Sequence, residues 1–197
     1  MENIVELASP EYAPTLHDVL LCRNRTSGVS EFAFRFKEQD FTIVDVGGQR
    51  AERRKWIHSF DHVNLLLFFA SLGEYDQTLE EDHRVNRLNE SLRLFAEIAN
   101  SKWFETVPLA LVLNKRDILA EKIKVRDLSM TFPDYTAGLD SYDNAVKFIT
   151  AKFIESTRSD RELYIHVTCA TDPNCIRDVF DDLANHMLHK SFDAAGV

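Results

Sequence analysis

The stretch TIVDVGGQRAERRKW, residues 42–56, places an apolar strand pattern directly before an aspartate, two glycines, a glutamine and a basic cluster. A carboxylate at a strand end, such as Asp45, can hold the water shell of Mg²⁺. Glycines such as Gly47 and Gly48 let a backbone N–H approach a phosphate, and the amide of Gln49 can orient a water. The alternative is a tight turn that opens a capped helix. On this motif alone the two interpretations have similar weight.

Alternating apolar residues on both sides of a polar corner predict a β-hairpin just before this stretch. Phe32, Phe34 and Phe36 alternate with smaller or charged residues. After a KEQD corner, Phe41 and Ile43 alternate again. Alternation with a period of two places one set of side chains on one face of a strand. We therefore expect two antiparallel strands joined by the corner.

Continuous apolar runs further along the chain predict buried strands. HVNLLLFFAS at 62–71 and VPLALVLN at 107–114 have the length of strands that are buried on both faces of a parallel sheet. ELYIHVT at 162–168 is a weaker third candidate. These three runs are expected to form a largely parallel sheet.

Amphipathic helices are predicted between and after these strands. Asp172 is a natural N-cap and Pro173 suits the first helical position, so the final helix has the clearest start. Strands that alternate with helices predict an α/β fold, whose ligands bind beyond the carboxyl ends of the strands. The predicted apolar faces are Val85, Leu88, Leu92, Phe95, Ala96 and Ala99; Ala145, Phe148, Ile149 and Phe153; and Ile176, Val179, Phe180, Leu183, Met187 and Leu188.

Two more strand ends carry residues that suit a nucleotide base. In NKRD, Asn114 and the lysine stem of Lys115 suit a purine, and Asp117 can accept from the amino and imino donors that guanine has and adenine lacks. TCAT, residues 168–171, offers backbone N–H groups to a base carbonyl. Each alone also fits a polar turn or a plain strand-to-helix loop, which is the better interpretation of TCAT in isolation. Three such loops in order are much less expected by chance.

Composition excludes several classes of protein. A net charge of −9 over 197 residues disfavours broad binding to nucleic acid or to an anionic membrane surface. No run of about 18 apolar residues is present to span a bilayer. Cys22, Cys169 and Cys175 are odd in number and lack metal-ligand spacing, so neither a disulfide framework nor a zinc site is predicted. We expect a soluble protein of a reducing compartment, without a nucleic-acid partner.

The series DVGGQ, NKRD and TCAT resembles the guanine-nucleotide-binding proteins of the Ras superfamily, and DVGGQRAERRKWIHSF resembles the alpha subunit of a heterotrimeric G protein. The resemblance continues through EYDQTLEEDHRVNRLNESLRLFAEIANSKWF, FPDY and YAPTLHDVLLCRNRTSGV, and covers nearly all of residues 8–190. It implies a Ras-like P-loop GTPase sheet with flanking helices, with 1–17 as a remnant of the helical insertion domain and 18–197 as a partial GTPase domain. A small Arf-like GTPase is disfavoured because it would lack RNRTSG and RAERRKW.

The resemblance implies a role for each matching residue. Arg23 would be the built-in arginine finger, and Gln49 would position the attacking water, as in that family. Thr26 and Asp45 would bind Mg²⁺, and Gly48 would sense the γ-phosphate of GTP. The implied cofactors are GTP or GDP and Mg²⁺. The implied nucleotide contacts are Thr26, Asp45, Gly48, Asn114, Lys115, Asp117, Cys169 and Ala170.

The resemblance also implies partners. A switch helix from Gln49 to about Phe60 would present Arg54, Lys55 and Trp56 to a G protein beta-gamma dimer, an effector enzyme or a regulator of G protein signalling. The final helix and tail would contact a G-protein-coupled receptor. The family implies a cytoplasmic location at the inner face of the plasma membrane, through a lipid anchor that we do not expect in this chain.

One motif of the family does not occur in the sequence. The phosphate loop G-x-x-x-x-G-K-[ST] is absent, since the glycines stand at 28, 47, 48, 73, 138 and 196 and none is followed by lysine. We therefore expect a truncated chain that lacks the first strand, the phosphate loop and the first helix. Two hypotheses follow: a GTPase switch that couples a receptor to effectors, or a non-catalytic form that binds beta-gamma or receptor without nucleotide.

Overall fold

In the computed structural model the chain forms two compact units, Met1–Asp61 and His62–Val197. None of the helices in the described part of the chain combines the length and the apolar character needed to cross a membrane. The described residues are 4, 8–22, 26–61, 63–158 and 161–195.

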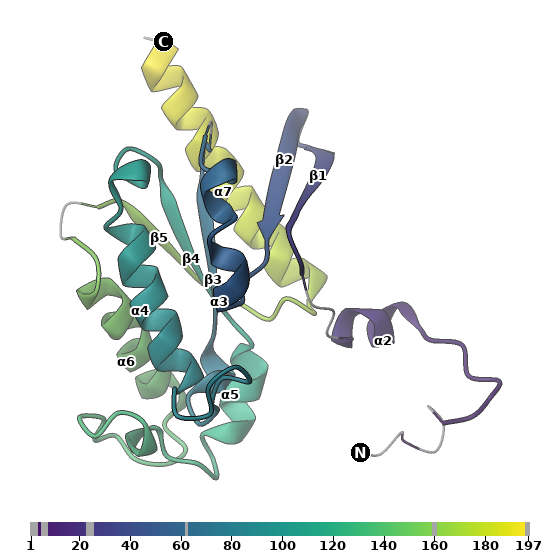
Figure 1. The fold of residues 1–197 in the computed structure, drawn as a ribbon, viewed down its shortest axis with the longest axis vertical. Coiled ribbons are helices and arrows are strands. Elements are labelled where there is room, and N and C mark those ends of the chain that lie inside the picture. The colour runs from purple at the N-terminus through teal and green to yellow at the C-terminus, as the bar shows by residue number, and fades with distance from the viewer. Residues whose placement is uncertain (1–3, 5–7, 23–25, 62, 159–160, 196–197) are drawn as a thin grey trace. The chain divides into compact units, whose positions relative to one another are not determined.

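The first unit contains the predicted hairpin. Strands β1 and β2 pair antiparallel, which confirms the expectation (Figure 1). Lys37 and Glu38 occupy the turn with φ angles of 48° and 61°. This left-handed pair gives the twist that a two-residue hairpin turn needs. The elements of the unit are α2 (Leu16–Leu21), β1 (Val29–Phe36), β2 (Gln39–Val46), α3 (Arg50–Arg53) and the 3₁₀ turn η1 (Trp56–Ser59).

The predicted continuous helix from Gln49 to about Phe60 is wrong. The structure has a four-residue helix, α3, followed by the separate 3₁₀ turn η1. The backbone N–H of Lys55 donates to the carbonyl of Glu52, and that of Phe60 to the carbonyl of Ile57. Bonds between residues three apart wind the chain more tightly than an α-helix and seldom persist beyond a few residues. The segment is therefore a series of short turns.

The second unit contains a three-stranded parallel sheet in the order β3-β4-β5 with helices around it. The predicted α/β class and parallel sheet are confirmed. The elements are β3 (Leu66–Ser71), η2 (Leu72–Glu74), α4 (Arg87–Ala99), η3 (Lys102–Phe104), β4 (Leu109–Asn114), α5 (Arg116–Lys122), η4 (Leu128–Met130), α6 (Tyr142–Glu155), β5 (Leu163–Val167) and α7 (Pro173–Ala195).

The core of this unit is built around β4, whose residues 109–113 are all buried, as predicted. Helices α4 and α6 lie side by side and pack against each other (Figure 1). The rings of Phe95 and Phe153 meet between them with centroids 5.2 Å apart. Val179 and Leu183 of α7 pack against Ala110 of β4, which explains the apolar face of the last helix. Each buried ring contributes about 1.5–3 kcal/mol.

Strand β3 differs from the expectation that the run 62–71 would be buried on both faces. The strand begins only at Leu66, and the Phe69 side chain is 55% exposed. Within the described part of this unit β3 pairs with β4 alone and is an edge strand. A strand at a sheet edge has a neighbouring strand on one side only, which leaves more of its surface uncovered. The apolar run therefore predicted that a strand forms here, but it did not predict how much of the strand is exposed to solvent.

The parallel register brings the carboxyl ends of the three strands to one edge of the sheet. Ser71 of β3 pairs with Asn114 of β4, and Leu113 pairs with Val167 of β5. The next helix after β5 is capped as predicted, since Oδ1 of Asp172 accepts from the backbone N–H of Asn174 at 3.0 Å. The loops that follow the three strands are therefore neighbours.

Candidate functional site

In the first unit, the two predicted ligands of Mg²⁺ are brought together. The hydroxyl of Thr26 donates to Oδ2 of Asp45 at 3.2 Å. No cluster of three or more histidine, cysteine or acidic residues that could hold a metal occurs among the described residues. Mg²⁺ usually takes only one or two protein oxygens and completes its shell with waters and phosphate oxygens. A hydroxyl and a carboxylate fit that requirement.

The paired glycines after β2 have different surroundings. The backbone N–H of Gly47 donates to the carbonyl of Gly28 at 3.1 Å. A Cβ at Gly47 would lie 2.8 Å from the carbonyl oxygen of Thr26 and 2.9 Å from the side chain of Glu52. A Cβ at Gly48 would meet nothing within 4 Å. Close packing therefore requires glycine at the first position, while the second presents an open backbone that a phosphate can approach.

Of the two predicted catalytic residues, Gln49 lies within the described part of the chain. Gln49 is the N-cap residue of α3, and its side chain makes no capping hydrogen bond. Its amide is therefore not used to hold the helix end. Arg23 lies outside the described residues.

Glu52 is a buried residue that the sequence did not single out. Its Oε2 accepts from the backbone N–H of Gly28 at 2.8 Å and from Nζ of Lys55 at 2.7 Å. The indole N–H of Trp56 donates to the carbonyl of Gly47 at 2.8 Å. Among the predicted partner-binding residues, Arg54 is exposed, while Lys55 and Trp56 brace the glycine turn. The one feature of the sequence that could have pointed to Glu52 is that it is the only acidic residue in the basic stretch RAERRKW.

In the second unit, the NKRD and TCAT segments meet. Oδ1 of Asn114 accepts from the backbone N–H of Ala170 at 2.8 Å and from the hydroxyl of Thr168 at 3.3 Å. The backbone N–H of Arg116 donates to the carbonyl of Thr168 at 3.1 Å. Because Ala170 N–H is a donor, it fixes which end of the Asn114 amide faces the protein. The amide oxygen of Asn114 is therefore used within the protein.

The remaining predicted base contacts stand at the start of α5 and in the TCAT loop. Lys115 is the N-cap residue of α5 and has a left-handed φ of 64°. This single residue connects the end of β4 to the start of α5. Asp117 is exposed in the first turn of α5. The thiol of Cys169 contacts the hydroxyl of Thr171 at 3.1 Å. Lys115, Asp117 and Asn114 therefore share one strand end.

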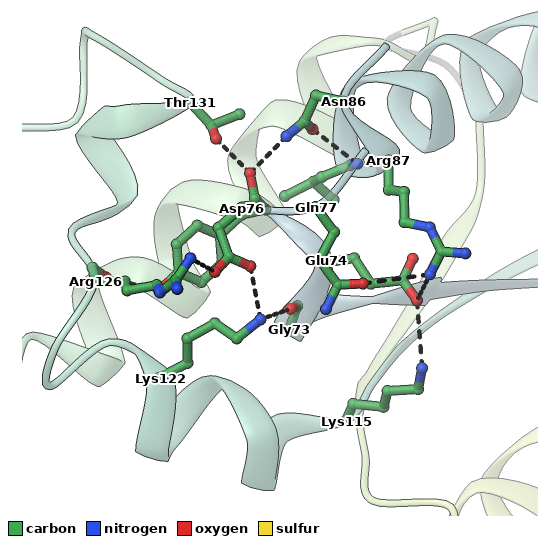
Figure 2. A network of polar contacts seen from close by, with 12 residues as sticks. Gly73, Glu74, Asp76, Gln77, Asn86, Arg87, Lys115, Lys122, Arg126 and Thr131 are labelled. Atoms are coloured by element: carbon green, nitrogen blue, oxygen red, sulfur yellow. Dashed lines mark hydrogen bonds and ion pairs between the residues drawn. The ribbon is translucent and has the colours of Figure 1, made fainter. Parts of the chain in front are cut away.

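A polar network after β3 fixes the position of α5, as Figure 2 shows. The Asp76 side chain is only 4% exposed and pairs with Nζ of Lys122 at 2.6 Å and with Arg126 at 2.9 Å. The buried hydroxyl of Tyr75 donates to the carbonyl of Arg126 at 2.7 Å. Burial is the main cause that raises the pKa of Tyr75 to about 12. The network holds α5 beside the end of β3.

Sequence reasoning missed this network although a usable signal was present. The segment LGEYD follows directly on an apolar run that was predicted to be a strand. The rule that places ligands beyond the carboxyl ends of parallel strands applies to this strand as much as to the others. Glu74 and Asp76 were therefore within reach of the same argument that found Asn114.

Comparison of the sequence with known proteins identifies the family of this chain. The sequence profile of the family described as G-protein alpha subunit matches residues 1–187. The chain belongs to this family. It is similar to the guanine nucleotide-binding protein alpha-7 subunit of Caenorhabditis elegans, with 44% identity over 100% of this chain and 56% of the relative. It is also similar to the G(o) subunit alpha of Locusta migratoria, with 42% identity over the same shares.

Membership of the G-protein alpha subunit family confirms the resemblance drawn from DVGGQ, NKRD and TCAT. The parallel sheet with helices around it fits a Ras-like GTPase fold. The chain spans about half the length of the relatives it matches, 56% in both cases cited. The predicted domain boundary between residues 17 and 18 stays a prediction.

Proposed function

We propose that this alpha-subunit chain forms part of a guanine-nucleotide switch with GTPase activity. The observation that supports it most is the hydrogen bond from Ala170 N–H to Asn114, which joins the two predicted base-binding segments. Beside them, the exposed carboxylate of Asp117 can accept from the amino and imino groups of guanine. Adenine lacks that pair of donors on the same edge. The chain should therefore prefer guanine to adenine nucleotides.

The first unit carries the residues that we propose for Mg²⁺ and phosphate binding. Thr26 and Asp45 would hold Mg²⁺, which when bound neutralises phosphate charge. The open backbone at Gly48 would meet the γ-phosphate. Gln49 would orient the attacking water, and the guanidinium of Arg23 would meet charge that develops in the transition state, as in the family.

The proposed partners are those of a heterotrimeric G protein. Arg54, Lys55 and Trp56 would bind a beta-gamma dimer, an effector or a regulator of G protein signalling, and α7 with its tail would contact a receptor. The contacts of Lys55 with Glu52 and of Trp56 with Gly47 support coupling of this surface to nucleotide. The place of action would be the inner face of the plasma membrane.

Titration of the purified 197-residue chain with a fluorescent GTP analogue tests the nucleotide proposal. We expect Mg²⁺-dependent binding that GDP displaces and ADP does not. Asp117→Asn should lose most of the guanine preference because an amide cannot accept from both donors. Asp178→Asn, at an exposed position on α7, is the matched control and should bind like the wild type. Absence of guanine binding together with retained beta-gamma binding would favour the non-catalytic alternative.

The catalytic roles need a separate test. In a longer chain that carries a phosphate loop ahead of residue 1, Gln49→Leu or Arg23→Cys should abolish GTP hydrolysis while GTP stays bound. Single-turnover hydrolysis with separated product nucleotides is the measurement. A normal rate in either variant would contradict the roles assigned to these residues.

A further inference from the structure

Glu74 lies where β3 and β4 end side by side. It is the last residue of η2, directly after β3, and Ser71 at the end of β3 pairs with Asn114 at the end of β4. Lys115 follows Asn114 in the chain. The register of a parallel sheet therefore puts a carboxylate from one loop next to a lysine from the next, as Figure 2 shows.

The carboxylate of Glu74 is held in place by a second cation. Oε1 of Glu74 lies 3.2 Å from Arg87, and the Glu74 side chain is 24% exposed. Arg87 itself is held from two directions, since its backbone N–H donates to the carbonyl of Gln77 at 2.8 Å and its guanidinium donates to Oε1 of Gln77 at 3.3 Å. A carboxylate with a fixed partner loses little further freedom when a second cation binds it.

The ammonium of Lys115 is bound by this same oxygen. Nζ of Lys115 lies 3.3 Å from Oε1 of Glu74. The Lys115 backbone is also fixed, because the residue is the left-handed junction between β4 and α5. Both ends of the side chain are thus restrained, yet the side chain remains 46% exposed. An ordered and accessible alkyl stem spans the gap between the strand end and the carboxylate.

We propose that Glu74 is a positioning residue for Lys115: it holds the ammonium so that the alkyl stem is ordered as a surface for the face of a guanine base. This inference rests on the proposed guanine site at Asn114, Lys115 and Asp117. A free lysine side chain samples many rotamers and loses conformational entropy when a ligand orders it. If the side chain is already ordered before the ligand binds, this entropy loss no longer opposes binding. Glu74 therefore acts through Lys115 and does not itself contact the nucleotide.

The acidic residue two positions further on has a different role. Asp76 binds Lys122 and Arg126, which lie at the far end of α5 and beyond it, and its side chain is almost fully buried. Asp76 therefore holds the helix, whereas Glu74 holds one side chain. Glu80 offers a closer control, because it pairs with Arg87 at 3.7 Å from an exposed position.

A double-mutant cycle on the 197-residue chain tests the proposal. The probe is GDP labelled on the ribose, and the variants are Glu74→Gln, Lys115→Ala and the pair. Glu74→Gln should weaken binding about threefold to tenfold, which is what ordering one such side chain is worth. In the Lys115→Ala background the same change should have less than about a twofold effect. Glu80→Gln should bind like the wild type.

Two outcomes separate this inference from the proposed function. A wild-type chain that binds guanine and adenine analogues equally would overturn the proposed function and this inference with it. A guanine-selective wild type in which the effects of Glu74→Gln and Lys115→Ala simply add would overturn the positioning role alone, since Glu74 would then act through Arg87.

A second measurement needs no nucleotide. Acylation of the Lys115 amine by a water-soluble ester, followed by mass spectrometry of its peptide, reports how free the ammonium is. Glu74→Gln should accelerate modification of Lys115 and leave that of Lys124 unchanged, because Lys124 pairs with Glu121. Equal rates at Lys115 in the variant and the wild type would overturn the proposal.

Discussion

The backbone N–H of Ala170 donates a hydrogen bond to Oδ1 of Asn114 at 2.8 Å, across 56 positions of sequence. The bond exists because β4 and β5 are parallel neighbours whose carboxyl ends coincide. It makes the side chain at one strand end part of the backbone structure at the next. The same amide therefore serves the stability of the fold and the nucleotide recognition that we propose.

Asn114→Ala should lower the free energy of unfolding by about 1–2 kcal/mol, because Ala170 N–H and the hydroxyl of Thr168 lose their acceptor. Urea unfolding followed by circular dichroism is the measurement. Asp117→Ala removes an exposed side chain of the same motif and should change stability by less than about 0.5 kcal/mol. Equal losses in the two variants would show that the bond does not stabilise the fold.

Gly47→Ala should destabilise the chain by about 1–3 kcal/mol, because the new methyl would overlap the backbone oxygen of Thr26, which cannot move aside as a side-chain tip can. The measurement is the urea midpoint of the first unit, followed by Trp56 fluorescence in a Trp103→Phe background, because the second tryptophan lies in the other unit. Gly48→Ala is the control, since a methyl there meets nothing within 4 Å. The prediction is wrong if the two alanine variants unfold alike.

Asp76→Asn should cost about 1.5–3 kcal/mol, because Lys122 and Arg126 lose a charged acceptor that is nearly buried. Thermal unfolding at low and high salt is the measurement. Glu121→Gln breaks the exposed pair with Lys124 and should cost almost nothing. A loss at Asp76 no greater than that at Glu121 would contradict the structural role of the network.

Stability should fall as the pH drops below 6.5, the ordinary pKa of histidine, in part because of His166 on β5. Burial is the main cause that lowers the pKa of His166, neighbouring His186 lowers it further, and Asp182 opposes them. The folded chain therefore favours neutral His166, and the unfolded chain takes up the proton first as the pH falls.

Replacing His166 by phenylalanine should flatten this part of the pH profile. Urea unfolding at several pH values between 5 and 8 is the measurement. His83→Gln removes an exposed histidine and provides the control. A profile for His166→Phe as steep as that of the control would count against the buried neutral imidazole.

Local patterns in the sequence were enough to predict most elements of the fold. The alternating phenylalanines predicted the hairpin, and the run 107–114 predicted a strand whose residues 109–113 are all buried. The Asp172–Pro173 pair predicted where the last helix begins. These features depend on neighbours in the chain, which a sequence displays directly.

Features that depend on distant partners were harder to predict. The helix α3 ends at Arg53 and the 3₁₀ turn η1 follows, where Trp56 donates to Gly47 and Lys55 donates to Glu52. Nothing in the helical pattern of the sequence signals these two acceptors. The exposure of Phe69 depends on what lies beyond the edge of β3, not on the strand's own residues. Glu74 acquires its partners only when the strand ends are aligned by the sheet.

Lys115 has a left-handed backbone with φ 64°. At this position, selection for higher stability therefore conflicts with the proposed contact of the lysine side chain with guanine. A residue with a side chain pays roughly 1–2 kcal/mol to adopt that conformation, and glycine or asparagine adopts it more easily. A library selected only for heat resistance would therefore drift toward glycine at position 115 and lose the alkyl stem. Thermostabilised variants of this chain should be chosen with position 115 held as lysine.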